Sequence, residues 1–227
     1  MGKTARNCGD ILAELKDLHS PENLAGMARF GINTENALGV PVTTLRRIAR
    51  NIRRNHDLAA ELWASGSHEA RILAGMVDEP ERVTEVQLEH WVLDFDSWDL
   101  CDQLCANLFE KTPLAWDKCV EWSRREEEFV RRAALALMAR LAVSDKGASD
   151  DQFEVFFPLI KREAGDSRNF VKKAVNWALR QIGKRNPALR GKAIACAREI
   201  AAGGTRSGRW IASDALRELS DKVTPTC

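Results

Sequence analysis

The sequence predicts an all-α protein, and three observations support this class. Nearly every segment places apolar residues at three- and four-residue spacing, which is the period of a helix with one buried face. Alternating runs bounded by hairpin turns, which would indicate strands, are missing. In three places an N-cap residue is followed by proline at the first helical position, and these pairs are Ser20-Pro21, Thr112-Pro113 and Asn186-Pro187.

Start and stop signals predict about a dozen helices along the chain. We expect them at residues 10–18, 21–30, 43–54, 57–64, 68–78, 85–94, 97–110, 113–124, 127–142, 151–164, 168–183, 187–202 and 208–220. The second helix ends at Gly31, and the longer connections are 31–42 and 144–150. Because no linker separates the helices, we expect one domain over residues 1–227.

Two segments share a short pattern that indicates an internal repeat. Phe129-Val130-Arg131-Arg132-Ala133 matches Phe170-Val171-Lys172-Lys173-Ala174 at an offset of 41 residues, within the period of two-helix HEAT or armadillo units. A helix pair cannot bury its apolar face alone, so neighbouring pairs stack and leave a curved surface along one side. We therefore expect Arg132 and Lys173 to occupy matching positions on that surface.

Composition favours a folded protein that holds neither a metal nor a disulfide framework. The chain has 227 residues, of which 44% are hydrophobic and 30% charged, and a chain of this size buries enough surface to fold unaided. The six cysteines form no Cys-x-x-Cys pair, and neither they nor the four histidines have metal-ligand spacing. We predict reduced thiols, no metal and no cofactor.

No segment indicates export or membrane insertion. The first seven residues lead into no apolar signal region, and no stretch approaches the roughly 18 uncharged apolar residues of a membrane span. We therefore expect a cytoplasmic protein with no membrane partner.

Charge is distributed unevenly along the chain. The formal net charge is +1, but residues 1–160 hold 19 Lys and Arg against 27 Asp and Glu, a net charge of −8, whereas residues 161–227 hold 15 against 6, a net charge of +9. The basic end suggests a polyanionic partner, and the alternative is a solvated basic face.

One carboxylate on the predicted helix 97–110 interrupts its apolar face. At about 100° per residue, Asp102 lies about 40° from Trp98 and about 20° from Phe109, at the border of the apolar arc. The opposite side carries the polar residues Asp99, Gln103, Asn107 and Glu110. An ionised carboxylate at that border costs free energy unless it has hydrogen bonds, a cation or a positively charged ligand. Asp102 is therefore a candidate site residue; the alternatives are an ion pair with an arginine of the next helix and, for Trp98, a place in the core.

Basic residues form two further candidate features. Lys173 and Trp177 are four residues apart and so share a helix face, which suits a phosphate backbone and an unstacked nucleotide; the alternative is a core tryptophan beside a solvated lysine. Near the start of the chain several arginines fall on one helical face and form either a binding surface or a solvated stripe, namely Arg46, Arg50, Arg53 and Arg54.

Several of these segments together resemble the HEAT-like-repeat DNA alkylation repair enzymes, the bacterial alkylpurine DNA glycosylases. The resemblance spans about residues 20–190 and rests on Met27-Ala28-Arg29-Phe30, Leu38-Gly39-Val40-Pro41, Leu45-Arg46-Arg47, Ser97-Trp98-Asp99-Leu100-Cys101-Asp102, Phe129-Val130-Arg131-Arg132-Ala133-Ala134, Phe170-Val171-Lys172-Lys173-Ala174-Val175-Asn176-Trp177-Ala178-Leu179-Arg180 and Asn186-Pro187. It implies a right-handed α–α superhelix, a HEAT-like repeat solenoid with a basic concave face.

The resemblance also implies roles for individual residues. Asp102 matches the catalytic aspartate of the family, Trp98 and Trp177 match the tryptophans that hold the backbone of the damaged nucleotide, and Arg132 matches an arginine that contacts phosphate. Further DNA contacts are expected from Lys173, Phe30, Arg131, Lys172 and Arg46. The chain departs from the family where Phe30 stands in place of a frequent tyrosine and Ser97-Trp98 in place of a double tryptophan.

The family acts on purines alkylated at N3 or N7, whose positive charge lets the base leave without a general acid. The resemblance thus implies a monofunctional N-glycosylase of base excision repair that binds double-stranded DNA with alkylated bases, as a monomer, in the cytoplasm at the nucleoid. The alternative is a helical-repeat module that binds DNA, RNA or protein without chemistry.

Overall fold

The computed structural model describes residues 6–220, and within these residues it contains helices and no strand. The predicted all-α class is therefore confirmed. Cys227 lies outside the described residues. The chain divides into two compact units, Met1–Pro113 and Leu114–Cys227, and the single domain expected over residues 1–227 stays a prediction.

Unit 1 packs its helices around a cluster of aromatic rings. Its elements are α1 (Cys8–Asp17), α2 (Pro21–Arg29), α3 (Val42–Ile52), α4 (His56–Ala64), α5 (His68–Val77), α6 (Glu85–Leu93), α7 (Trp98–Asn107) and the 3-10 helix η1 (Phe109–Lys111). The rings of Trp63 and Trp91 stack with centroids 4.1 Å apart, and Phe95 packs against Trp63 and Phe109. These contacts join α4, α6 and η1 through one apolar core.

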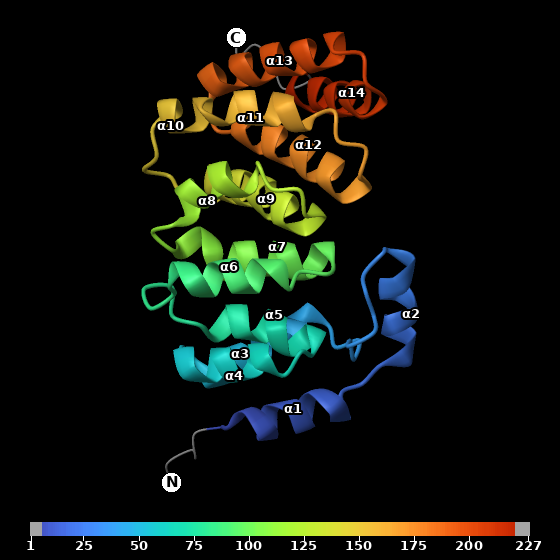
Figure 1. Cartoon of the computed structure of the whole chain (residues 1–227), viewed down its shortest axis with the longest axis vertical. Helices are drawn as coiled ribbons and strands as arrows, with labels where there is room; N and C mark the ends of the chain where they lie inside the picture. The colour runs from blue at the N-terminus through green and yellow to red at the C-terminus, as the bar shows by residue number, and fades with distance from the viewer. Residues whose placement is uncertain (1–5, 221–227) are drawn as a thin grey trace, which may run out of the picture. The chain divides into compact units, whose positions relative to one another are not determined.

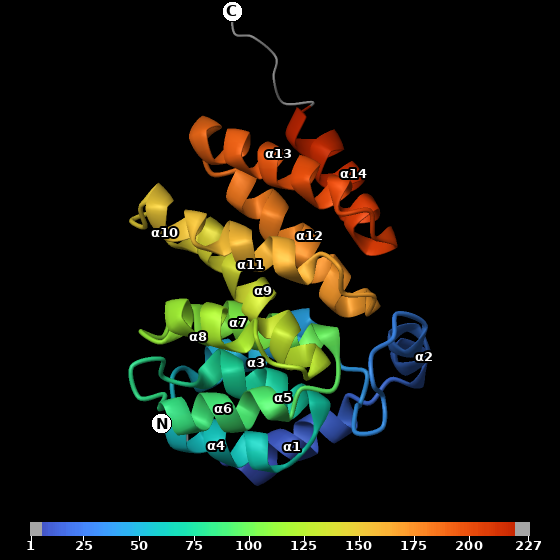
Figure 2. The same ribbon diagram turned by 45° about the horizontal axis from the view of Figure 1, so that its top comes forward.

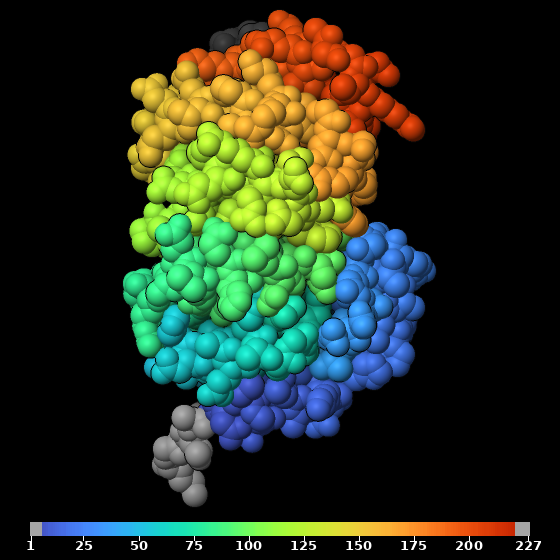
Figure 3. Space-filling view, in the orientation of Figure 1, coloured from blue at the N-terminus to red at the C-terminus, as the bar shows by residue number. Residues whose placement is uncertain are grey.

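Helix α2 differs from the other helices of unit 1 because none of its residues is buried. Figure 1 shows it beside α3 and α5, and in the space-filling view of Figure 3 its segment (blue) stands out as a ridge on the surface. Its position therefore depends on the segments that flank it.

Unit 2 consists of stacked helix pairs. Its elements are α8 (Ala115–Trp122), α9 (Glu128–Ser144), α10 (Asp150–Glu154), α11 (Phe156–Glu163), α12 (Asn169–Gly183), α13 (Pro187–Ala202) and α14 (Arg206–Ser220). Figure 2 shows α12 beside α13 and α14, and packing contacts also join α9 to α12.

The internal match corresponds to contacts between successive helices of unit 2. The rings of Phe129 and Phe170, which occupy matching positions, lie with their centroids 5.8 Å apart. One helix further along the chain, Asn176 Nδ2 donates a hydrogen bond to Asp214 Oδ2 at 2.7 Å, between α12 and α14. Neighbouring helix pairs thus stack against one another, as the repeat predicts.

Most predicted helix boundaries agree with the structure to within two residues. Ser20 Oγ accepts a hydrogen bond from the Asn23 amide at 3.3 Å, and Asn186 Oδ1 accepts one from the Leu189 amide at 2.9 Å, so both predicted N-caps are confirmed. Gly31 has a φ of +74° where α2 ends, again as predicted.

The predicted boundaries at three places are wrong for local reasons. Thr112 is not an N-cap: its hydroxyl donates to the Phe109 carbonyl at 2.9 Å and closes η1, and α8 begins only at Ala115. The segment predicted as helix 97–110 ends its α-helix at Asn107 and tightens into η1. The segment predicted as helix 151–164 divides at Val155, because Pro158 has no N–H to donate to the carbonyl four residues earlier.

The described residues include five cysteines, all with reduced thiols: Cys8, Cys101, Cys105, Cys119 and Cys196. Burial raises the pKa of the Cys119 thiol well above its usual value and that of Cys196 to about 12. Both are therefore protonated near neutral pH, and their role is packing.

The connection between α2 and α3 is held by a buried carboxylate of α5. Glu69 is 1% exposed, and its carboxylate accepts hydrogen bonds from the amides of Leu38, Gly39 and Val40 at 2.7 to 3.2 Å. At the same turn, Asn23 Nδ2 of α2 donates to the Gly39 carbonyl at 2.8 Å. The loop thus connects α2 to α5 through polar contacts at one point.

Gly39 is required at this point for two reasons. Its φ is +78°, and a Cβ would lie 2.4 Å from the Ser20 carbonyl oxygen. Gly66 has a similar φ of +72°, but a Cβ there would meet no atom within 4 Å. The two glycines therefore share the backbone conformation and differ in crowding.

We expect Gly39→Ala to lower the free energy of unfolding more than Gly66→Ala does. Both replacements place a side chain in the left-handed region, which costs about 1–2 kcal/mol, and only Gly39→Ala adds a backbone clash, worth about 1–3 kcal/mol. Urea denaturation of both variants measures the difference. Equal losses would show that the close approach to Ser20 has no energetic weight.

Candidate functional site

The N-terminal end of α7 carries two of the predicted site residues on neighbouring turns. Trp98 is the first residue of α7, and its indole Nε1 donates a hydrogen bond to the Phe30 carbonyl at 3.0 Å. Asp102 follows four residues later and so lies on the same side of the helix. The indole therefore joins the C-terminal end of α2 to the helix that bears the candidate carboxylate.

A cavity of about 640 Å³ lies in unit 1 between α2, α5, α7 and the loop after α2. Most of its wall is apolar, with contributions from Met27, Ile32, Val40, Val42, Ile72 and Trp98. Asp102 is half-buried and lines this cavity. Its carboxylate therefore lies beside a largely apolar hollow.

Phe30 lies at the edge of the same cavity and is 72% exposed. An exposed phenylalanine and a half-buried indole thus line the same cavity as the carboxylate. The structure thus brings Phe30, Trp98 and Asp102 to one hollow of unit 1, and the roles expected of these residues stay predictions.

The polar side of α7 differs in one respect from the helical-wheel prediction. Asp99 and Gln103 were predicted on the side opposite the apolar arc, yet both line the cavity together with Asp102. The reason is tertiary: α2 and its loop cover this side of α7, so a face that would be solvated in an isolated helix borders a hollow.

Asp99 has a partner that the sequence did not indicate. Its Oδ2 lies 2.9 Å from Nε2 of His68, the first residue of α5, and His68 is 4% exposed. Burial by itself would lower the pKa of His68, but the hydrogen bond and charge of Asp99, followed by the charges of Glu69 and Asp96, outweigh it and raise the pKa. The pair therefore favours an imidazolium facing a carboxylate.

The spacing of these buried polar residues is a signal that the sequence does carry. His68 precedes Ile72 by four residues and Glu69 precedes Leu73 by four, and both apolar residues are at most 2% exposed. Polar side chains at this spacing lie on the buried face of the helix. The signal is easily missed, because an acidic residue in the first turn of a helix is also typical of an ordinary solvated helix start.

Arginines of α3 form a second surface in unit 1. Arg46 and Arg50 are exposed and line a hollow of about 430 Å³ together with Asn107 of α7. Neither forms an ion pair with any residue between 6 and 220. Arg54, predicted on the same face, instead donates to the Asp78 carbonyl.

In unit 2, helix α12 carries Lys173 and Trp177. Lys173 is exposed and Trp177 is half-buried, so neither belongs to the fully buried core. Beside them Asn176 is buried and Arg180 donates to Glu218 Oε2 at 2.5 Å. One side of α12 thus contacts α14 through Asn176 and Arg180, and Lys173 is exposed to solvent.

Arg132, the residue that matches Lys173 in the repeat, has a different environment. It is 6% exposed, and its Nη1 donates to the Phe170 carbonyl at 2.7 Å, from α9 to the first turn of α12. The two matching positions are therefore not equivalent in exposure. The contact of Arg132 with DNA phosphate stays a prediction.

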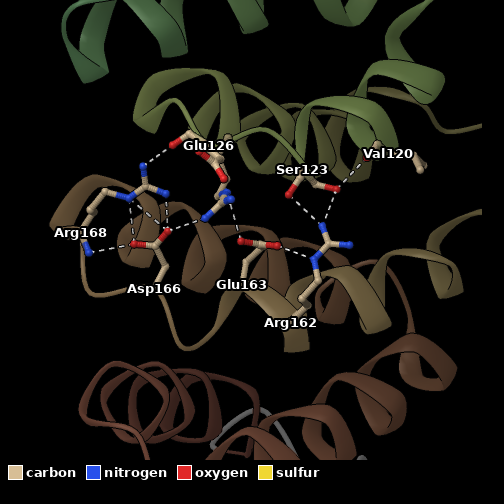
Figure 4. Close-up of polar contacts among 8 residues, drawn as sticks. Val120, Ser123, Glu126, Arg162, Glu163, Asp166 and Arg168 are labelled. Atoms are coloured by element: carbon tan, nitrogen blue, oxygen red, sulfur yellow. Dashed lines mark hydrogen bonds and ion pairs between the residues drawn. The ribbon is translucent and has the colours of Figure 1, made fainter.

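Arg131 takes part in an ion-pair network between α9, α11 and the loop before α12. Its Nη1 lies 3.0 Å from Asp166 Oδ2 and its Nε lies 3.1 Å from Glu163 Oε2. Figure 4 shows Arg168 on the other side of Asp166 and Arg162 on the other side of Glu163. The guanidinium of Arg131 thus has two carboxylate partners, and its contact with DNA stays a prediction.

Within residues 6–220, no group of three or more His, Cys, Asp or Glu side chains is arranged to hold a metal ion. None of the helices in this part of the chain has the combined length and apolar character that crossing a bilayer requires.

The sequence and fold match known proteins of one kind. The profile of a family described as DNA alkylation repair enzyme matches residues 11–219. A solved structure described as "A new family of proteins related to the HEAT-like repeat DNA glycosylases with affinity for branched DNA structures" is similar with a TM-score of 0.76 and 22% sequence identity, over 86% of this chain and 83% of that chain. The likeness confirms the predicted HEAT-like repeat fold, while the basic concave face stays a prediction. No curated protein matches the sequence.

We expect His68→Gln to reduce stability more at pH 6 than at pH 9. Because the folded state raises the pKa of His68, the protonated pair stabilises the fold fully below the usual histidine pKa of about 6.5, and this contribution is lost as the pH rises through the folded-state pKa. The measurement is the free energy of unfolding of both proteins at each pH. His90→Gln, at an exposed position of α6, controls for histidine loss. A gap between wild type and His68→Gln that is constant or widens with pH would contradict the assignment.

Proposed function

This chain belongs to the DNA alkylation repair enzyme family, and from that premise we propose that it is a DNA glycosylase. Its substrates are purines that carry a positive charge after alkylation at N3 or N7, in double-stranded DNA. The enzyme hydrolyses the N-glycosidic bond of the damaged nucleotide and uses no cofactor. We place it in base excision repair, as a monomer in the cytoplasm at the nucleoid.

One observation carries the proposal: Asp102 is half-buried at the wall of a largely apolar cavity, beside Trp98 and near the exposed ring of Phe30. A carboxylate in a water-poor environment interacts with a developing positive charge more strongly than it would in water. This position suits a group that acts on a cationic transition state.

The chemistry requires little more than this carboxylate. An alkylated purine already carries the positive charge, so breaking the glycosidic bond releases a neutral base and leaves the cationic character on the sugar. The bond electrons go to the base, and water adds to C1′ of the sugar and loses a proton. Asp102 stabilises the oxocarbenium-like sugar electrostatically and orients the attacking water. No general acid has to protonate the leaving base.

The other site residues position the DNA. Trp98 is fixed by its hydrogen bond to the Phe30 carbonyl and offers a flat apolar surface to the sugar. In unit 2, Lys173 is an exposed cation suited to phosphate, and Trp177 is a half-buried indole on the same helix. Arg46 adds an exposed cation in unit 1. We assign Arg132, Arg131 and Lys172 supporting contacts on the DNA backbone, since each already has a protein partner.

A second candidate is a non-catalytic protein that binds DNA. The similar solved structure belongs to a family described as related to the glycosylases and as having affinity for branched DNA structures. A protein of that kind would bind four-way or forked DNA more tightly than a plain duplex and would release no base from alkylated DNA. Both properties can be measured on the same preparation.

We expect Asp102→Asn to slow base release by about 100- to 1000-fold, or about 3–4 kcal/mol in the activation free energy. The amide keeps the shape of the side chain and removes the charge that stabilises the sugar cation. The measurement is single-turnover release of 7-methylguanine from methylated duplex DNA. DNA affinity, measured on the undamaged duplex, should change little.

Asp117→Asn serves as the matched control, because it makes the same chemical change at an exposed position of α8. Its rate should equal that of the wild type. An unaltered rate in Asp102→Asn would reject the catalytic assignment, and the lack of any release by the wild type would favour the second candidate.

We expect Lys173→Gln to weaken binding to duplex DNA regardless of sequence or lesion. The plot of log affinity against log salt concentration has a negative slope, and loss of one phosphate contact should make this slope less steep by about 0.9. A salt titration of fluorescence anisotropy measures this slope. Lys161→Gln, which removes an exposed lysine that is paired with Glu199, is the control. An equal slope in the wild type and in Lys173→Gln would show that Lys173 does not contact a DNA phosphate.

A further inference from the structure

Unit 2 contains a hollow of about 430 Å³ that the proposed catalytic site does not use. It lies where the first turn of α14 meets the N-terminal part of α12 and is lined by Ser167, Lys172, Arg206, Ser207 and Trp210. Packing contacts join α12 and α14, and Figure 2 shows the two helices side by side. The hollow is therefore built by residues that are about 40 positions apart in the chain.

An exposed indole forms one wall of this hollow. Trp210 is 42% exposed, although a tryptophan normally buries most of its large apolar surface. The ammonium of Lys172 lies 4.9 Å from the centroid of its ring, a cation–π contact that fixes the lysine beside the indole. The wall thus combines a flat apolar surface with a positive charge.

A second cation belongs to the same face of α14. Arg206 precedes Trp210 by four residues, so the two side chains are neighbours on the helix. Arg206 is exposed, and neither it nor Lys172 has an ion-pair partner among the described residues. The charges of this hollow therefore remain available to an anion.

The carboxylate that adjoins the hollow in the sequence does not cancel this charge. Asp166 precedes Ser167 in the chain, but its side chain is 8% exposed and is paired with both Arg131 and Arg168. These arginines hold its pKa below the usual value despite burial, which by itself would raise it. The carboxylate thus belongs to the network of Figure 4 and leaves the hollow positively charged.

We infer that this hollow, which we name the α12–α14 hollow, binds an unpaired stretch of DNA strand outside the site of base release. Lys172 and Arg206 bind successive phosphates, and the indole of Trp210 stacks on one base. The inference rests on the proposed function only in taking DNA as the partner. It adds a subsite for a part of the DNA that carries no lesion.

The indole is the reason to prefer an unpaired strand over a duplex. The cations alone would attract the phosphates of either form. A paired base in a duplex has both faces covered by its neighbours, so it cannot stack on Trp210, whereas every unpaired base offers a free face. The combination of one exposed indole with two cations that line the same hollow therefore matches a single strand.

The test compares three variants on two undamaged DNA molecules, a labelled 20-nucleotide single strand and a blunt duplex of the same length. Trp210→Ala should weaken single-strand binding by about tenfold or more, because it removes one stacked base, and should change duplex binding less than twofold. Arg206→Gln should make the negative slope of log single-strand affinity against log salt concentration less steep by about 0.7, the value for one phosphate contact. Lys172→Gln should do the same.

Arg198→Gln is the matched control, because Arg198 is exposed on α13 and does not line the hollow. Its affinity for the single strand should exceed that of Arg206→Gln. If Trp210→Ala fails to fold, as judged by circular dichroism, Arg206→Gln at its exposed position still decides the question. Wild-type affinity for the single strand in the folded variants would overturn the inference, and so would an equal loss of affinity for the duplex in Trp210→Ala.

The result is separable from the proposed function. Asp102→Asn should bind the undamaged single strand as the wild type does, and Trp210→Ala should release 7-methylguanine from a blunt alkylated duplex at the wild-type rate. If the wild type releases the base and Trp210→Ala binds the single strand as tightly as the wild type does, the single-strand role of the α12–α14 hollow is rejected and the glycosylase proposal stands. If the variants of the α12–α14 hollow lose single-strand binding but the wild type releases no base from alkylated DNA, the glycosylase proposal is rejected and the role of the hollow stands.

Discussion

The cavity of unit 1 depends on a buried anion, the carboxylate of Glu69. Transferring a charge into the interior is costly unless hydrogen bonds replace its water, and here the amides of residues 38–40 do so. The same contacts hold the loop that follows α2. Because α2 itself has no buried residue, the loop and the indole of Trp98 hold it beside the cavity. The shape of the site therefore depends on the stability of this loop.

Unit 2 is held differently, by contacts that repeat from one helix to the next. Arg132 reaches the Phe170 carbonyl, Asn176 reaches Asp214, and Arg180 reaches Glu218, each across 38 residues. These polar contacts accompany an apolar core and set the register between neighbouring pairs. Basic residues that take part in such contacts, such as Arg131 and Arg132, connect neighbouring segments of the fold. Those with no such partner among residues 6–220, such as Lys173 and Arg206, remain available to a polyanion.

This division explains why the charge of the C-terminal part is a poor guide to its binding residues. Residues 161–227 carry a net charge of +9, yet several of the cations there form ion pairs with carboxylates of the same region, either in the loop before α12 or on α14. A site residue in such a repeat is a cation or an indole whose surface the stacking leaves open. On the proposed function, the protein needs these open groups to hold DNA and one carboxylate to act on it.

The sequence by itself determined the class of the fold, the helices and the family, because helical spacing, N-caps at Ser20 and Asn186 and glycine at 31 are local signals. It also indicated Asp102, because a carboxylate at an apolar border is visible on a helical wheel. The tertiary structure alone decided that Asp99 faces His68, that Glu69 binds a loop 30 residues away and that Arg132 is buried while Lys173 is exposed. The physical reason is that burial and pairing are properties of what packs against a side chain, and a segment distant in the chain supplies that neighbour.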